Sequence, residues 1–170
     1  MEEIFVNKVA NSGLISLNLE DYYSVGDRVE IDVKELLFMG LVLKEKDFRE
    51  FIKTNDWSAY QNKFVAVYCS TDAIVPTWAY MLISAKLSGI AAKVVFGDLN
   101  ALEAAIWETA FDEINIDDYR DQKVVIKGCG DLPVSPAAYT NISNKLVPVV
   151  HSLMYGEPCS TVPVYKRKTV

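Results

Sequence analysis

Three short apolar runs stand out in the second half of the chain, at residues 64–68, 92–96 and 123–127. Each is rich in valine, isoleucine and aromatic residues, a pattern typical of strands buried on both faces. Polar residues, glycine or an amphipathic stretch separate the runs. The pattern therefore predicts three strands with helices between them.

The stretches that follow the three runs have apolar residues at helical spacing. The first predicts a helix over 73–88, with Thr71 or Asp72 as its N-cap. The second resembles a capping box at 100–103 and predicts a helix to about residue 112. The last is expected to begin at the Ser135-Pro136 pair and to run to Gly156.

The first 57 residues have a less regular pattern. Residues 29–33 alternate like a half-exposed strand, and residues 44–57 have aromatic and aliphatic side chains at helical spacing. We interpret 1–57 as a mixed α/β segment and 58–170 as a parallel β-α core. Together they predict one α/β domain over 1–170, with a three-layer, mainly parallel, Rossmann-like sheet.

Cysteines follow two of the predicted strands directly or almost directly. Cys69 comes after 64–68 and Cys129 comes two residues after 123–127. If 64–68 is central, with 92–96 on one side and 123–127 on the other, the strand order reverses between the two cysteines. Ligands of open α/β sheets bind at such a switch point, beside helix N-termini that favour a thiolate. We therefore expect these two thiols to lie close together.

A third cysteine, Cys159, follows the predicted end of the last helix in a Gly-Glu-Pro-Cys-Ser turn. The segment 157–163 is long enough, if extended, to bring Cys159 back over the sheet. Three thiolates leave one coordination position open. This suits either Zn²⁺, completed by Asp72, His151 or water, or an iron–sulfur cluster with one free iron.

Each of these residues also has a structural interpretation. A cysteine is by default a small buried apolar residue, Asp72 is a helix cap, and His151 is a residue near a helix C-terminus, where the dipole favours its protonated form. For Asp72 and His151 the structural interpretation is favoured. Trp78, Tyr80 and Tyr139 could line a pocket near two helix starts, although aromatic residues at helical spacing are typical of a core.

Composition and charge narrow the classes of function. The chain of 170 residues has a net charge of −6, which disfavours binding to nucleic-acid phosphates. Its 3 Cys and 1 His are too few for a disulfide framework. The acidic start of the chain lacks the features of a signal peptide, and the longest uncharged apolar stretch, 73–85, is too short to span a membrane. We therefore expect a cytoplasmic protein with reduced thiols and no membrane partner.

Motifs for nucleotide binding and hydrolysis are absent. The Gly128-Cys129-Gly130 segment lacks the third glycine of a dinucleotide fingerprint, and the sequence contains no Walker A loop, HExxH, GxSxG or CxxC motif. Three hypotheses follow. The leading one is a metal or iron–sulfur centre held by three cysteines; the others are a cysteine-nucleophile or sulfur-transfer enzyme without metal, and a non-enzymatic binding module with buried structural thiols.

Four segments resemble an uncharacterised bacterial family catalogued as domain of unknown function 2480. They are 56–58, 69–80, 127–129 and 156–163, and the resemblance extends over nearly the whole chain. The resemblance implies no activity. It implies a loose association with iron–sulfur cluster assembly operons, which favours iron over zinc and suggests iron–sulfur assembly proteins as partners.

Overall fold

The computed structural model describes residues 13–127 and 130–168. These residues form two compact units. Unit 2 comprises Val25–Ile106, and unit 1 comprises the chain up to Ser24 and from Trp107 onward, so unit 2 is inserted into unit 1 along the sequence. Among the described residues, every helix is too short or too polar to cross a membrane. That residues 1–170 fold as one domain stays a prediction.

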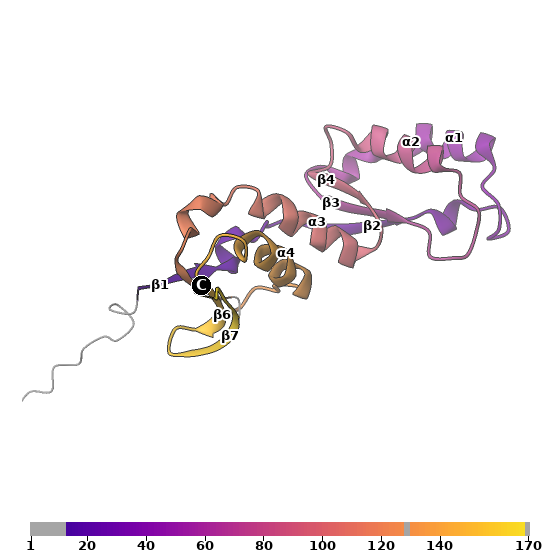
Figure 1. Cartoon of the computed structure of the whole chain (residues 1–170). Coiled ribbons are helices and arrows are strands. Elements are labelled where there is room, and N and C mark those ends of the chain that lie inside the picture. Colours follow the sequence, from indigo (N-terminus) through magenta and orange to yellow (C-terminus); the bar gives the residue numbers. More distant parts are fainter. Residues whose placement is uncertain (1–12, 128–129, 169–170) are drawn as a thin grey trace, which may run out of the picture. The chain divides into compact units, whose positions relative to one another are not determined.

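Unit 2 contains a three-stranded parallel sheet in the order β2-β3-β4, with α1 and α2 on one face (Figure 1). The first part of α3 packs on the other face. The elements are β2 (Arg28–Asp32), α1 (Glu45–Thr54), β3 (Phe64–Tyr68), α2 (Thr77–Leu87), β4 (Lys93–Phe96) and α3 (Leu99–Phe111).

The central strand β3 is buried on both faces, as its apolar run predicts. Val65 and Val67 point toward α1 and α2 and belong to the same core as Ile83. Ala66 points the opposite way and packs against Leu102 of α3. Successive side chains of a strand alternate between its faces, so an uninterrupted apolar run is what a doubly covered strand requires.

Unit 1 contains a four-stranded sheet in the order β1-β5-β6-β7, in which only the β6–β7 pair is antiparallel. Its core joins the end of α3, with Trp107 and Phe111, to α4, with Ile142 and Leu146. The elements are β1 (Leu14–Asn18), β5 (Lys123–Lys127), α4 (Pro136–Leu146), β6 (Ser152–Glu157) and β7 (Ser160–Lys166).

The two units repeat one structure. Strand β3, helix α2 and strand β4 of unit 2 correspond to β5, α4 and β6 of unit 1, and equivalent residues are 59 positions apart. Strands β2 and β1 are also equivalent, and they pair with β3 and β5 in the same register. Identical pairs at this spacing include Tyr60/Tyr119, Val65/Val124, Val75/Val134, Ala79/Ala138, Tyr80/Tyr139, Ile83/Ile142, Ser84/Ser143, Lys86/Lys145, Leu87/Leu146 and Gly97/Gly156.

A glycine after the third strand of each repeat is required by the backbone. Gly97 has φ 131° and Gly156 has φ 117°, a region that side chains rarely allow. A Cβ atom on Gly97 would lie 2.6 Å from the Ala101 Cβ atom, and one on Gly156 would lie 2.7 Å from the Ser160 oxygen. The repeat therefore preserves a steric requirement as well as a pattern of apolar residues.

The structure confirms a mixed α/β chain with mainly parallel strands and corrects the predicted strand order. Strand β3 was expected between 92–96 and 123–127, but it pairs with β2 and β4. The run 123–127 forms β5, which pairs with β1 and β6 in the other sheet. The prediction failed because residues 14–18 and 28–32 each supply a first strand, so β3 and β5 each have a neighbour from the N-terminal segment in a separate sheet.

Three predicted helix ends are also wrong. Helix α2 begins at Thr77 and not at residue 73, so Asp72 is not its N-cap. Helix α3 begins at Leu99, and the Asp98 carboxylate accepts a hydrogen bond from the Ala101 N–H. Helix α4 begins at the predicted Ser135 cap but ends at Leu146, because Pro148 cannot continue a helix; the residues expected to complete it form β6.

Truncation of the equivalent leucines tests the two cores. Leu87 and Leu146 are both fully buried at the end of equivalent helices. We expect Leu87→Ala and Leu146→Ala each to lower the free energy of unfolding by about 2–5 kcal/mol, measured by urea denaturation, because each leaves a cavity in a separate core. A loss below about 1 kcal/mol for either variant would contradict the described packing.

Candidate functional site

Cys69 lies in the loop between β3 and α2 of unit 2. Its side chain is half-buried against the core of this unit, and its thiol donates a hydrogen bond to the Thr71 carbonyl oxygen at 3.5 Å. Asp72, in the same loop, is exposed. Because α2 begins only at Thr77, the expected position of Cys69 at a helix N-terminus is wrong.

The other candidate ligands belong to unit 1. Cys159 is exposed in the tight turn between β6 and β7, and His151 immediately precedes β6. An extended strand therefore separates these two residues. Cys129 lies outside the described residues. Within 13–127 and 130–168, no three His, Cys, Asp or Glu side chains are grouped to hold a metal ion. The three-cysteine centre stays a prediction.

A carboxylate ties the loop after β3 to the end of β2. The Asp32 carboxylate accepts hydrogen bonds from the backbone N–H groups of Ser70 and Lys34, each at 3.0 Å. Burial pushes the pKa of Asp32 upward, but the Ser70 hydroxyl, these two N–H groups and the charge of Lys34 outweigh it, so the pKa lies below its ordinary value. This network holds the loop that carries Cys69.

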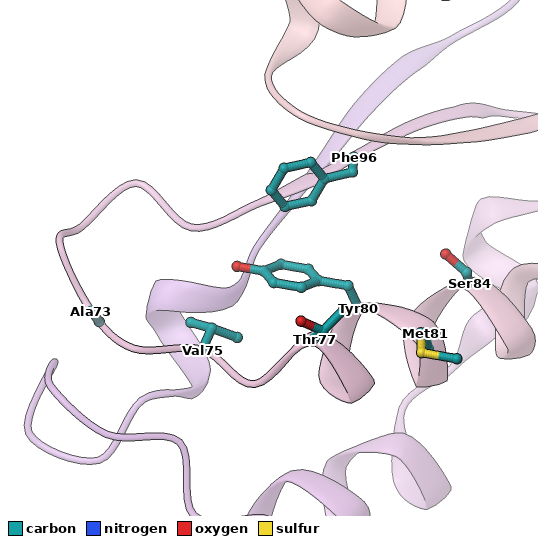
Figure 2. A pocket seen from close by; sticks show the side chains of 7 residues that line it. All are labelled: Ala73, Val75, Thr77, Tyr80, Met81, Ser84 and Phe96. Carbon is teal, nitrogen blue, oxygen red and sulfur yellow. The ribbon is translucent and has the colours of Figure 1, made fainter.

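A groove of about 810 Å³ lies beside this loop, between α2 and β4 of unit 2. We name it the α2–β4 groove. Figure 2 shows Tyr80 and Phe96 facing each other across it, with Met81 and Ser84 further along α2. The lining residues are Ala73, Val75, Thr77, Tyr80, Met81, Ser84 and Phe96.

An aromatic pair lines the α2–β4 groove. The rings of Tyr80 and Phe96 meet edge to face, with centroids 5.0 Å apart and an interplanar angle of 79°. Burial raises the pKa of the Tyr80 phenol. Electrostatic repulsion from the thiolate form of Cys69 and from the Asp32 carboxylate raises this pKa further. The phenol therefore stays neutral at physiological pH and is available as a hydrogen-bond donor.

The remaining chemistry of the groove is uncharged. Its polar side-chain groups are the hydroxyls of Thr77, Tyr80 and Ser84, and its large apolar side chains include Met81 and Phe96. These last two side chains are 66% and 70% exposed, which is high for large apolar residues. A groove of this kind can hold an apolar group and fix its orientation through a few hydroxyls.

Unit 1 has an equivalent, smaller groove of about 390 Å³, which we name the α4–β6 groove. Tyr139 and Tyr155 take the places of Tyr80 and Phe96, again edge to face, with centroids 5.5 Å apart and an angle of 82°. Thr140 replaces Met81, and Val164 of β7 adds a wall that unit 2 lacks. The α4–β6 groove is thus smaller, and a strand of its own unit supplies part of its wall.

The sequence indicated only part of these grooves. Of the three aromatic residues considered as pocket walls, Tyr80 and Tyr139 line the grooves, whereas Trp78 packs edge to face against Phe48 in the core. Met81 and Phe96 were missed. The recurrence of Ala-Tyr-x-x-Ile-Ser and of an aromatic residue before glycine, both 59 positions apart, was the signal that could have found them.

Comparison with known proteins identifies a family without a described activity. A family model described as "Protein of unknown function (DUF2480)" matches residues 2–167, which confirms the resemblance found in the sequence. Neither the curated proteins nor the solved structures contain a match. The cytoplasmic location and the iron–sulfur assembly partners expected from the sequence stay predictions.

The lowered pKa of Asp32 predicts an acid-sensitive contribution to stability. A carboxyl group whose pKa is lower in the folded than in the unfolded chain stabilises the fold above its unfolded pKa of about 3.9. This contribution is lost as the pH falls through the folded pKa. We therefore expect Asp32→Asn to weaken the fold at pH 7 and to flatten the loss of stability below about pH 4, as followed by urea unfolding.

Carboxyl NMR titration provides the control. The Ser70→Ala variant, which removes the hydroxyl donor, should bring the pKa of Asp32 closer to its ordinary value. A wild-type pKa at or above that value would contradict the hydrogen-bond network.

Metal analysis tests the predicted three-cysteine centre. The hypothesis requires about one zinc ion or one iron–sulfur cluster per chain in protein purified without oxygen. It also requires that the triple variant with Cys69→Ser, Cys129→Ser and Cys159→Ser contain none of that metal. The circular dichroism spectrum of the triple variant should match that of the wild type, which shows that the fold is preserved. Metal-free wild-type protein, or metal retained by the triple variant, would contradict the hypothesis.

Proposed function

Because the chain belongs to the DUF2480 family, whose description gives no activity, we propose a function from the chemistry of its groove: a non-enzymatic binding module. In this proposal the α2–β4 groove takes an uncharged, largely apolar part of the ligand. The observation that carries the proposal is the exposure of Met81 and Phe96 at the rim of a groove without charged lining residues.

Burial of the rim residues supplies the binding energy. Large apolar side chains exposed side by side are typical of binding surfaces, because they gain free energy when a ligand removes them from water. Full burial of a methionine or phenylalanine side chain is worth about 1.5–3 kcal/mol. Met81 and Phe96, both mostly exposed, are therefore well placed to stabilise a complex.

The polar groups support binding over catalysis. General acid–base catalysis needs a group that exchanges a proton near the working pH. The groove offers three hydroxyls, and the raised pKa of Tyr80 keeps its phenol neutral. Next to the groove, the Cys69 thiol donates to Thr71 and the Asp32 carboxylate accepts from Ser70. These contacts hold the loop, and the hydroxyls are suited to orienting a neutral ligand.

Binding of Nile red, an uncharged fluorophore, tests the proposed function. We expect saturable binding of about one molecule per chain, because the α2–β4 groove, at about 810 Å³, is larger than the α4–β6 groove, at about 390 Å³. Met81→Lys places a charge at the rim and should weaken binding at least about tenfold, which corresponds to about 1.4 kcal/mol. The side chain of Met81 is mostly exposed, so the fold should tolerate this change.

Thr140→Lys is the matched control, since Thr140 occupies the equivalent position in unit 1. This variant should bind Nile red as the wild type does. The absence of saturable binding, or equal effects of the two lysine substitutions, would overturn the proposal.

A further inference from the structure

The equivalent third strands of the two units differ at their outer edge. In unit 1, β7 lies on the outer edge of β6 and pairs with it antiparallel. In unit 2, β4 is the last strand of its sheet as far as the described residues show. An edge strand presents backbone N–H and C=O groups that can pair with a further strand.

The backbone of Phe96 faces this open edge. The Gly97 N–H donates to the Val67 oxygen of β3, so Gly97 points toward the neighbouring strand. Successive residues of a strand direct their backbone groups to alternate sides, which turns those of Phe96 outward. In unit 1 the equivalent residue, Tyr155, is opposite Val162 of β7. Phe96 therefore occupies the position that pairs with an added strand in the other repeat.

The added strand also covers part of the groove in unit 1. Val164 of β7 lines the α4–β6 groove beside Tyr139 and Tyr155. Tyr155 is 37% exposed, compared with 70% for Phe96, its equivalent in unit 2. The surface that unit 2 leaves open thus corresponds to the surface on which unit 1 carries its own strand.

Building on the proposed function, we infer that the ligand of the α2–β4 groove is an extended segment of a partner protein. This segment adds to β4 antiparallel, as β7 adds to β6. By analogy with Val162 and Val164, it carries one uncharged β-branched residue opposite Phe96 and a second, two positions further on, over Met81. Backbone pairing supplies affinity in this mode, and the groove selects the side chain.

The pairing of β7 with β6 in unit 1 favours a single partner strand over a second copy of the chain as the occupant of the β4 edge. The occupant observed in unit 1 is one strand of seven residues, Ser160–Lys166. Two β4 strands paired about a two-fold axis would meet over only the four residues of Lys93–Phe96, because Gly97 has φ 131° and α3 begins at Leu99. A β4–β4 dimer is therefore an outcome of the test and not the proposal.

A synthetic peptide with the sequence of residues 159–167, carrying Cys159→Ser, serves as the probe. Titrated into the full-length ¹⁵N-labelled protein, it should shift the amide signals of β4 and α2, with a Kd between about 1 µM and 1 mM. The same peptide with Val164→Asp should bind at least about tenfold more weakly, because it would bury a charge over Met81.

Two substitutions at Phe96 separate backbone pairing from side-chain contact. Phe96→Ala removes only the ring, whereas Phe96→Pro also removes the outward N–H, a change that edge strands tolerate. Strand addition predicts that Phe96→Pro weakens peptide binding at least about tenfold more than Phe96→Ala. Nile red, which cannot pair with the backbone, should bind both variants equally.

The outcomes separate this inference from the proposed function. If Nile red binds as expected but the peptide shifts no signals, or if the two Phe96 variants bind the peptide equally, strand addition is wrong and the binding groove stands. Shifts confined to β6 and α4 would mean that the peptide replaces β7, which also overturns the inference. A concentration-dependent dimer of the wild type, measured by sedimentation and abolished by Phe96→Pro, would likewise overturn the inference. If the wild-type protein binds neither Nile red nor the peptide, both proposals are overturned.

Discussion

Parallel pairing of a central strand with two neighbours is the constraint on which each unit depends. Strand β3 lies between β2 and β4, and β5 lies between β1 and β6. Parallel strands cannot be joined by a tight turn, so a helix connects them and must cover the sheet. Ala79, Ile83 and Leu87 supply the inner face of α2, which leaves Tyr80, Met81 and Ser84 to line a groove. The geometry that stabilises the core therefore also places the candidate site.

The two units share this arrangement and differ at one edge of the sheet. After β6, Gly156 leads into a hairpin whose second strand, β7, covers the edge and part of the groove. After β4, Gly97 leads into α3, which turns to the opposite face of the sheet. The segment that follows the glycine therefore distinguishes the units: β7 covers part of the α4–β6 groove, whereas the α2–β4 groove is larger.

Cys69 and Cys159 have different surroundings in the two units. Cys69 is held in the loop after β3 by its own thiol and by the Asp32–Ser70 network, whereas Cys159 is exposed at a hairpin turn. The expected proximity of Cys69 and Cys129 depended on a strand order that the structure does not have. The sequence indicated the end of β3 beside which the α2–β4 groove lies but not its lining by Met81 and Phe96, and metal binding by the thiols stays a prediction.

The sequence by itself determined the strands 64–68, 92–96 and 123–127 closely, because local apolar runs and turn residues decide whether a short segment is extended. It also determined the Ser135 cap. Tertiary structure decided which strands pair, since pairing depends on contacts between β1 and β5 and between β2 and β3, distant in sequence. It likewise decided which helix face lines a groove, because the burial of Ile83 and the exposure of Met81 follow only from the docking of α2 on its sheet.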